Sequence, residues 1–112
     1  MFYKTNEDTE LLTVNEFINE WQDKEEYLFV DIRETDEIAT NGGVKGAFNI
    51  SMYDIPEQIE MAPSYIVCIF LCDNGGRSAQ IAKYFKNNEF ENMFAIEGGI
   101  EALVATCPEL KV

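Results

Sequence analysis

The sequence predicts an α/β domain with a mostly parallel central sheet that is flanked by helices on both faces. The chain has 112 residues, a length typical of one domain, so residues 1–112 are expected to form a single unit. Short apolar runs alternate with amphipathic stretches of helical period, the pattern of parallel strands joined by helices. The longest apolar run, residues 65–71, is continuous, so it is expected to be a central strand covered on both faces.

The first half of the chain is expected to contain two strands and three helical segments. Thr13 and Glu16 have the spacing of a capping box, so a helix with Phe17 on its apolar face is expected to begin there. The other segments are a strand at 27–30 that ends at Asp31, a helix at 34–40 stopped by Asn41-Gly42-Gly43, a strand at 47–50, and helical turns at 56–61.

The second half begins with the central strand, which a Gly-rich loop follows. The remaining segments are a helix at 78–88, a strand at 93–96, a turn at Gly98-Gly99 and a final helix at 100–106. In open parallel α/β sheets, the functional site lies beyond the carboxyl ends of the strands. The loop after the central strand is therefore the expected position of a site.

The charge balance excludes several classes of partner. The net charge is −13, and twelve of the 21 acidic residues fall within positions 1–40. Such a surface repels nucleic acid and anionic membranes, so neither is expected as a partner. A solvated acidic face that keeps the protein in solution is the favoured interpretation, and a docking face for a basic protein partner is the alternative.

Histidine and cysteine counts limit the chemistry and the compartment. The chain contains no histidine, which excludes a Ser-His-Asp triad, a Cys-His pair and histidine metal ligands, and no metal or cofactor is expected. Three cysteines are an odd number and do not suggest a disulfide framework. No apolar run reaches membrane-spanning length and the N-terminus does not resemble a signal peptide, so a cytoplasmic protein is expected.

The loop Cys72-Asp73-Asn74-Gly75-Gly76-Arg77-Ser78 carries the candidate chemistry. Its paired glycines allow successive backbone N–H groups to turn inward, the next helix adds unpaired donors, and Arg77 adds a positive charge. A cysteine surrounded by such donors is expected to exist largely as the thiolate, and the same donors would stabilise a persulfide anion. Sulfur transfer by thiolate attack needs little general acid or base, so the absence of histidine does not exclude it.

The stretch from Asp31 to Leu103 resembles a single-domain rhodanese. The motifs that carry the resemblance are Asp31-Ile32-Arg33-Glu34 with Glu37, Gly46-Ala47-Phe48-Asn49-Ile50, the loop Cys72–Ser78 with four residues between Cys and Arg, and Gly98-Gly99. The chain departs from the family at Gly43, where many members have histidine, and at Leu103, where they have tryptophan. Both positions are expected to belong to the scaffold.

The resemblance implies a sulfurtransferase that carries sulfane sulfur as a persulfide on Cys72. The donor would be thiosulfate or a protein or low-molecular-weight persulfide, and the acceptor a thiol or cyanide. The resemblance implies that Cys72 is the nucleophile, that Arg77 stabilises the loop or an anionic donor, and that the remaining loop residues bind the substrate. Those residues are Asp73, Asn74, Gly75, Gly76 and Ser78.

Asp73, and the pair of Asp31 and Arg33, also bear on the expected site. Asp73 places a carboxylate beside the nucleophile, where it is expected to repel dianionic thiosulfate and to favour a protein persulfide or a neutral donor. Asp31 and Arg33 follow another strand, so they could approach the same crevice, although a local structural ion pair or helix cap is the preferred interpretation.

Other functions are compatible with parts of the sequence. A cysteine phosphatase resembles this loop but has five residues between Cys and Arg, and a non-catalytic binding or sensing module would keep only the fold. Cys68 lies four strand steps before Cys72, roughly 13 Å away, too far for a disulfide. Cys107 could resolve a persulfide if the fold brings it close, but a semi-exposed structural cysteine is favoured.

Overall fold

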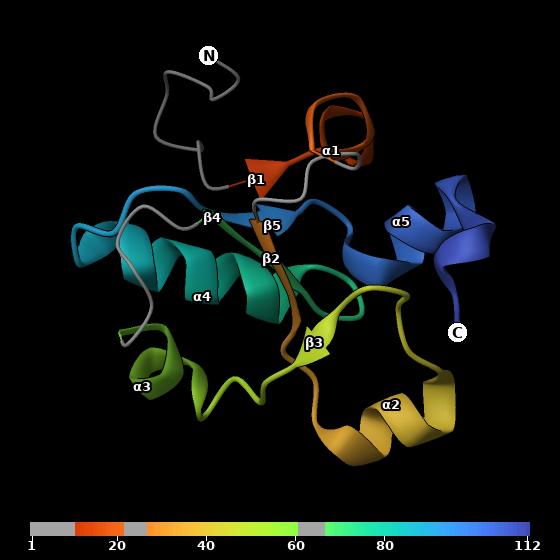
Figure 1. Ribbon diagram of the computed structural model, residues 1–112, viewed down its shortest axis with the longest axis horizontal. Helices are drawn as coiled ribbons and strands as arrows, with labels where there is room; N and C mark the ends of the chain where they lie inside the picture. Colours follow the sequence, from red (N-terminus) through yellow and green to blue (C-terminus); the bar gives the residue numbers. More distant parts are fainter. Residues whose placement is uncertain (1–10, 22–26, 61–66) are drawn as a thin grey trace.

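The computed structural model describes residues 11–21, 27–60 and 67–112, and its centre is a five-stranded parallel sheet (Figure 1). The strand order is β1-β5-β4-β2-β3, with every neighbouring pair parallel. The strands are β1 (Leu11–Leu12), β2 (Tyr27–Asp31), β3 (Phe48–Asn49), β4 (Val67–Leu71) and β5 (Met93–Ile96). The predicted fold class is confirmed, and β4 is the central strand that the apolar run predicted.

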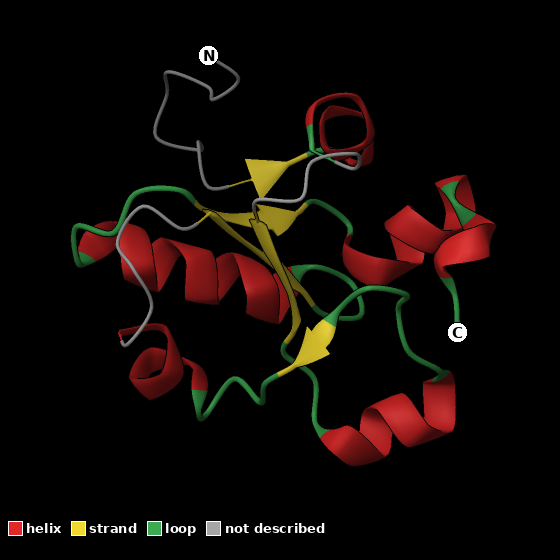
Figure 2. Ribbon diagram, in the orientation of Figure 1, coloured by secondary structure: helices red, strands yellow, loops and turns green. Residues whose placement is uncertain are grey.

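Helices connect the strands and cover both faces of the sheet (Figure 2). They are α1 (Val14–Glu20), α2 (Thr35–Asn41), α3 (Ile55–Glu60), α4 (Gly76–Asn87), α5 (Gly99–Thr106) and the 3-10 turn η1 (Pro108–Leu110). The sequence did not predict β1 or η1, because two or three residues are too few to show a period. Within the described ranges, no helix has the length and apolarity needed to cross a bilayer.

The side chains of β4 alternate between two apolar cores, one on each face of the sheet. Cys68, Phe70 and Cys72 face the core formed with α3 and α4, which includes Ile59 and Phe85. Ile69 and Leu71 face the core formed with α1 and α5, which includes Phe17 and Leu103. The buried residues of both cores are at most 7% exposed, so each face of the sheet is covered.

The structure confirms the predicted start of α1 and moves the predicted start of α4. Thr13 Oγ1 accepts from Glu16 N at 3.1 Å and Glu16 Oε1 accepts from Thr13 N at 2.8 Å, so the capping box is confirmed. The helix predicted at 78–88 begins at Gly76 instead, two residues earlier. The reason is that Gly75 serves as the N-cap with φ of +93°, so Arg77 and Ser78 already belong to the first turn.

β5 has the predicted bounds, 93–96, and the other boundaries differ from the predictions by about one residue. β3 is shorter than the predicted strand at 47–50, and α2 is shifted by one residue from 34–40. The predicted helical turns at 56–61 correspond to α3, although residue 61 lies outside the described residues, as do the first two residues of the predicted strand at 65–71. These shifts leave the carboxyl ends of β2, β4 and β5 at one edge of the sheet.

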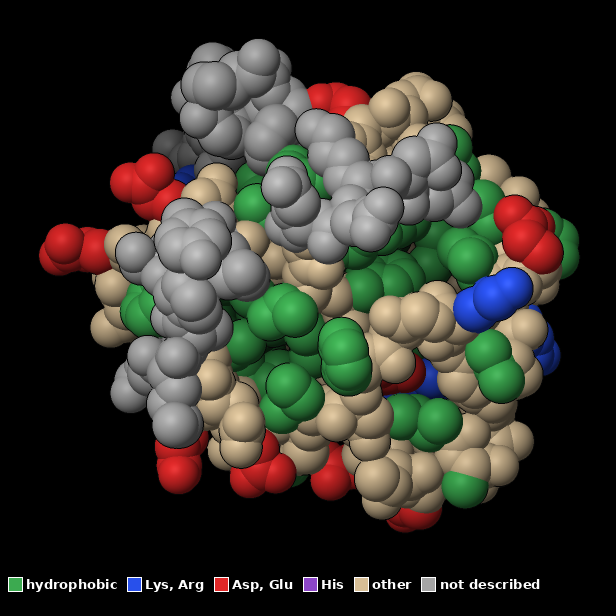
Figure 3. Space-filling model, in the orientation of Figure 1, with side chains coloured by type: hydrophobic (Ala, Val, Ile, Leu, Met, Phe, Trp, Pro, Cys, Tyr) green, Lys and Arg blue, Asp and Glu red, His purple; other side chains and the backbone are tan. Residues whose placement is uncertain are grey.

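Acidic side chains are distributed along the rim of the face shown in Figure 3. Of the twelve acidic residues in positions 1–40, six lie outside the described residues, so the suggested docking face is only partly described. The described members include Glu34 and Glu37 on and beside α2, and both make hydrogen bonds within the domain.

Candidate active site

Cys72 lies directly after β4, and its side chain is fully buried. Two groups of Ser78 lie beside its sulfur: the backbone N–H donates to Sγ over 3.3 Å, and the hydroxyl Oγ lies at 3.3 Å from Sγ. The Ser78 hydroxyl also lies 3.3 Å from the carbonyl oxygen of Gly75. Because Ser78 is in the first turn of α4, the sulfur sits at the positive end of a helix of twelve residues.

The loop is closed by a turn that its glycines and Asn74 make together. Gly75 adopts a left-handed conformation, and its carbonyl accepts from Ala79 N at 3.1 Å as the first hydrogen bond of α4. Asn74 Oδ1 accepts from the backbone N–H of Gly76 at 3.0 Å. The side chain of Asn74 therefore stabilises the turn itself, a role that the sequence pattern did not specify.

The Gly98-Gly99 turn lies against the back of the loop. Ile100 N donates to the carbonyl of Cys72 at 2.8 Å, and Glu101 N donates to the carbonyl of Asp73 at 3.0 Å. A Cβ atom on Gly99 would lie 2.5 Å from both the Cys72 carbonyl oxygen and the Gly75 nitrogen. The first turn of α5 thus holds two loop carbonyls away from the reactive side of the loop. The sequence predicted the Gly98-Gly99 turn, but it did not show that the turn would pack against the loop that follows β4.

Asp31 and Arg33 form a buried ion pair next to the loop. Arg33 Nη2 lies 2.7 Å from Asp31 Oδ2, and both side chains are about 3% exposed. Arg33 Nη2 also donates to the carbonyl of Gly42 at 2.9 Å, and Asn49 Nδ2 donates to the carbonyl oxygens of Asp31 and Arg33. The hydrogen bonds that the Arg33 side chain donates to Asp31 are the main reason why the pKa of Arg33 is raised. The pair connects β2, β3 and α2.

Replacing Arg33 by methionine is expected to destabilise the domain by about 3–5 kcal/mol, because the Asp31 carboxylate would remain buried without its partner. Urea unfolding followed by circular dichroism measures this change. The double variant Asp31→Asn with Arg33→Met removes both charges and should recover a large part of the loss. Equal destabilisation in the single and double variants would show that packing of the Arg33 stem, and not the ion pair, is what matters.

The side chain of Arg77 is bound to Glu37 of α2. Its Nη1 and Nη2 donate to the two carboxylate oxygens of Glu37 at 3.0 and 2.7 Å. These hydrogen bonds, followed by one from the backbone of Glu34, lower the pKa of Glu37 to about 2. The same contact raises the pKa of Arg77. The sequence contained Glu37 as part of a motif, but did not show that it would meet a residue forty positions later.

Asp73, which the sequence places beside the nucleophile, lies between two arginines. Its Oδ2 lies 3.5 Å from Arg77 Nη2 and its Oδ1 lies 3.7 Å from Arg33 Nη1. The side chain is 41% exposed, so solvent screens these contacts in part. The charge of Asp73 is therefore opposed by two guanidinium groups.

The other two cysteines are buried, and none of the three is in a disulfide. Burial raises the pKa of Cys68 to about 12, so this thiol is a core residue and not a nucleophile. Cys107 follows α5 and is 6% exposed, which corrects the expectation of a semi-exposed side chain. Burial, followed by the charge of Glu109, raises its pKa as well.

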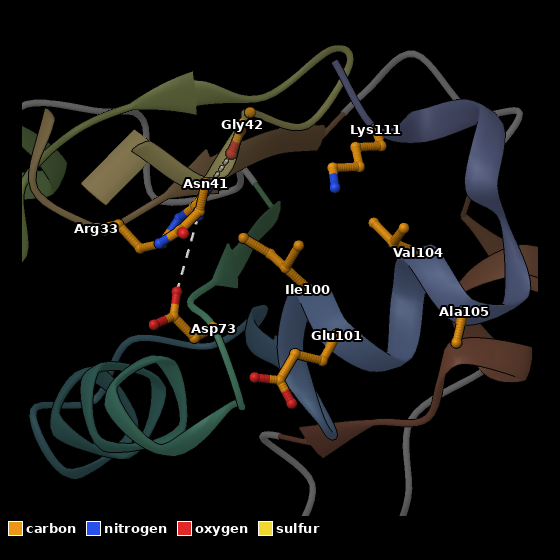
Figure 4. Close-up of a pocket in the computed structure, with 10 residues that line it drawn as sticks. Arg33, Asn41, Gly42, Asp73, Ile100, Glu101, Val104, Ala105 and Lys111 are labelled. Carbon is orange, nitrogen blue, oxygen red and sulfur yellow. Dashed lines mark hydrogen bonds and ion pairs between the residues drawn. The ribbon is translucent and has the colours of Figure 1, made fainter. Parts of the chain in front are cut away.

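A pocket of about 550 Å³ opens beside the loop, between α2 and α5 (Figure 4). Asp73 and Arg33 form one side, and Ile100, Val104 and Lys111 line the other side. Glu101 adds a second carboxylate to its wall. In the described part of the chain, no cluster of three or more Cys, Asp or Glu side chains is arranged to bind a metal ion.

Together, the fold and the site define a parallel α/β domain with a cysteine at the base of a Gly-rich loop. The model of the rhodanese-like domain family matches residues 13–106. The chain therefore belongs to the rhodanese-like domain family, as the sequence motifs indicated.

Relatives of this chain have names that refer to sulfur transfer. YtwF of Bacillus subtilis, whose name proposes a sulfurtransferase, is 38% identical over 78 residues, 70% of this chain and 74% of the relative. Thiosulfate sulfurtransferase GlpE of Stutzerimonas stutzeri is 30% identical over 81 residues, 72% of this chain and 73% of the relative. The relatives support a rhodanese-type enzyme and leave its donor open.

Solved structures share the fold at similar levels. A Rhodopseudomonas palustris protein, described as being of unknown function and as a candidate tyrosine phosphatase, has a TM-score of 0.73 and 26% identity, covering 88% of this chain and 81% of that one. A rhodanese-like domain protein of Staphylococcus aureus has a TM-score of 0.66 and 27% identity, covering 84% and 90%. The overall fold is thus shared with solved structures that include a rhodanese-like domain protein.

Proposed function

We propose that this protein is a sulfurtransferase that carries sulfane sulfur on Cys72 as a persulfide. The observation that carries the proposal is the position of Sγ, which lies at the first turn of α4 with the N–H and hydroxyl of Ser78 both at 3.3 Å. These groups can stabilise a negative charge on sulfur without a histidine. Membership in the rhodanese-like family and the names of the relatives support the same class of reaction.

The reaction consists of two sulfur transfers in sequence. The Cys72 thiolate attacks the outer sulfur of the donor, a new S–S bond forms, and the old S–S bond breaks to release the donor's thiolate, or sulfite from thiosulfate. An acceptor thiolate or cyanide then attacks the outer sulfur of the Cys72 persulfide. The product is an acceptor persulfide or thiocyanate, and the Cys72 thiolate is regenerated. No external oxidant or reductant is consumed.

Each loop residue has a role in this proposal. Ser78 stabilises the sulfur anion directly, whereas Asn74, Gly75 and Gly76 set the backbone turn around it. Arg77 stabilises the loop through Glu37, because its guanidinium is already bound there. A reducing compartment such as the cytoplasm suits the free thiols.

A cysteine phosphatase is the second candidate, and the description of the Rhodopseudomonas palustris neighbour favours testing it. The loop has four residues between Cys72 and Arg77, which suits one sulfur atom better than a phosphoryl group. Hydrolysis of an aryl phosphate that is lost in Cys72→Ser would favour the phosphatase. A non-catalytic module would react with neither kind of substrate.

The decisive experiment measures the intact mass of the protein after incubation with thiosulfate and, separately, with cysteine persulfide. The gain of one sulfur atom that is removed by a thiol or cyanide, and that is absent in Cys72→Ser, supports the proposal. Peptide mapping then assigns the sulfur to Cys72 and not to Cys68 or Cys107. An unchanged mass with both donors would contradict it.

A further inference from the structure

Resting on the proposed sulfur transfer, we propose that Glu37 is a specificity-determining residue of this site. It occupies the guanidinium of Arg77 and, together with Asp73, leaves the loop without a free arginine. The site is thereby directed away from doubly charged oxyanion donors such as thiosulfate, and toward sulfur that is carried on a thiol. The donor class is then a persulfide of a small thiol or of a protein cysteine.

The contact between Glu37 and Arg77 is bidentate. Both carboxylate oxygens accept from the guanidinium, in the two-point geometry that is stronger than a single charge contact. Glu37 Oε2 also accepts from the backbone N–H of Glu34 at 3.0 Å, which closes a capping box at the start of α2. The carboxylate is therefore held by the helix as well as by the arginine, and an incoming anion would have to displace it.

The second guanidinium near the loop is occupied in the same way. Arg33 is bound to Asp31 and to the carbonyl of Gly42, and its Nη1 faces Asp73. Two arginines are thus matched by three carboxylates, those of Asp31, Glu37 and Asp73. The adjoining pocket adds Lys111 and Glu101, whose charges cancel. The local sum is a net negative charge.

A net negative charge affects donors according to the charge at their reacting end. Thiosulfate carries two negative charges close to its outer sulfur, whereas a persulfide carries at most one. One unit charge about 8 Å away, at an effective dielectric of about 40, changes the rate at which a monoanion meets the site roughly sixfold and that of a dianion roughly thirtyfold. The backbone donors of the loop act on the sulfur in both cases, so they do not distinguish the two donors.

The test measures the local potential without requiring sulfur transfer. Iodoacetate and iodoacetamide have nearly the same shape, but only the first is an anion, so the ratio of their alkylation rates at Cys72 reports charge near Sγ. Burial of Cys72 and its thiolate fraction affect both rates equally and cancel in the ratio. Intact mass and peptide mapping follow the reaction.

Glu37→Gln is expected to raise the iodoacetate to iodoacetamide ratio roughly sixfold. Glu91→Gln is the matched control, because it makes the same charge change on an exposed side chain. Glu91 precedes β5, at the end of the sheet opposite the Cys72 loop, so the alkylation ratio of this variant should stay at the parent value. Glu37→Asp keeps the charge and should also stay near the parent. A ratio in Glu37→Gln that equals the ratio in Glu91→Gln would overturn the proposal.

The same variants then separate this inference from the proposed function. With thiosulfate as donor, Glu37→Gln should load Cys72 roughly thirtyfold faster, whereas loading from cysteine persulfide should change sixfold or less. If no donor loads the protein but the alkylation ratio shifts, the charge role of Glu37 stands and sulfur transfer is wrong. If both donors load at rates that Glu37→Gln leaves unchanged, sulfur transfer stands and the specificity role is wrong.

Discussion

Replacing Cys72 by serine is expected to abolish sulfur loading, by at least about a thousandfold, while the domain still folds. The hydroxyl is a poor nucleophile at neutral pH and cannot form a persulfide, so both transfer steps fail. Serine is close in size to cysteine and can hydrogen-bond to Ser78, so the expected change in the free energy of unfolding is about 1 kcal/mol. Intact mass after exposure to donors measures the loss, and urea unfolding measures the stability.

Cys68→Ala and Cys107→Ala are the matched controls for this prediction. Both thiols are buried and their pKa values are raised, so neither should accept sulfur in place of Cys72. Cys68→Ala should lose stability because it leaves a space in the core beside α4, but it should keep most of its activity. Sulfur transfer by Cys72→Ser within a few fold of the parent rate would show that another thiol is the nucleophile.

Gly99→Ala is expected to lower the free energy of unfolding by about 2–5 kcal/mol and to reduce sulfur loading with it. The new Cβ would lie 2.5 Å from the Cys72 carbonyl oxygen and from the Gly75 nitrogen, and 2.7 Å from the Asp73 carbonyl oxygen. All three are backbone atoms of the loop, so the loop or the start of α5 must move. The residue also has φ of +65°, which alanine adopts at a cost.

Gly46→Ala is the control that separates these two causes. Gly46 has φ of +85°, but a Cβ there would have no atom within 4 Å. The expected loss is about 1–2 kcal/mol from the backbone conformation alone, with sulfur loading at the parent rate. Equal losses of stability and activity in the two variants would mean that the contact between Gly99 and the loop does not support the site.

Features that depend on neighbours along the chain were determined by the sequence alone. The continuous apolar run before Cys72 identified the central strand, because only a strand covered on both faces can be apolar throughout. Thr13 and Glu16 identified the start of α1, because a capping box joins residues three positions apart. The loop from Cys72 to Ser78 was located by its glycines and by its place after that strand.

Features that depend on which elements become neighbours in space were decided by the tertiary structure. Glu37 and Arg77 are forty positions apart and meet only because α2 and α4 begin at the same edge of the sheet. Asp73 was expected to repel dianionic donors from beside the nucleophile, and only the folded chain brings Arg33 of another segment close to it. No side chain fits at Gly99, because backbone atoms of the Cys72 loop pack against it. The residues next to Gly99 in the sequence do not predict this contact. The periodicity of apolar residues predicts which segments are buried, because it depends only on neighbours along the chain. The charge around the Cys72 sulfur depends on side chains from several segments, so it is known only once the chain has folded.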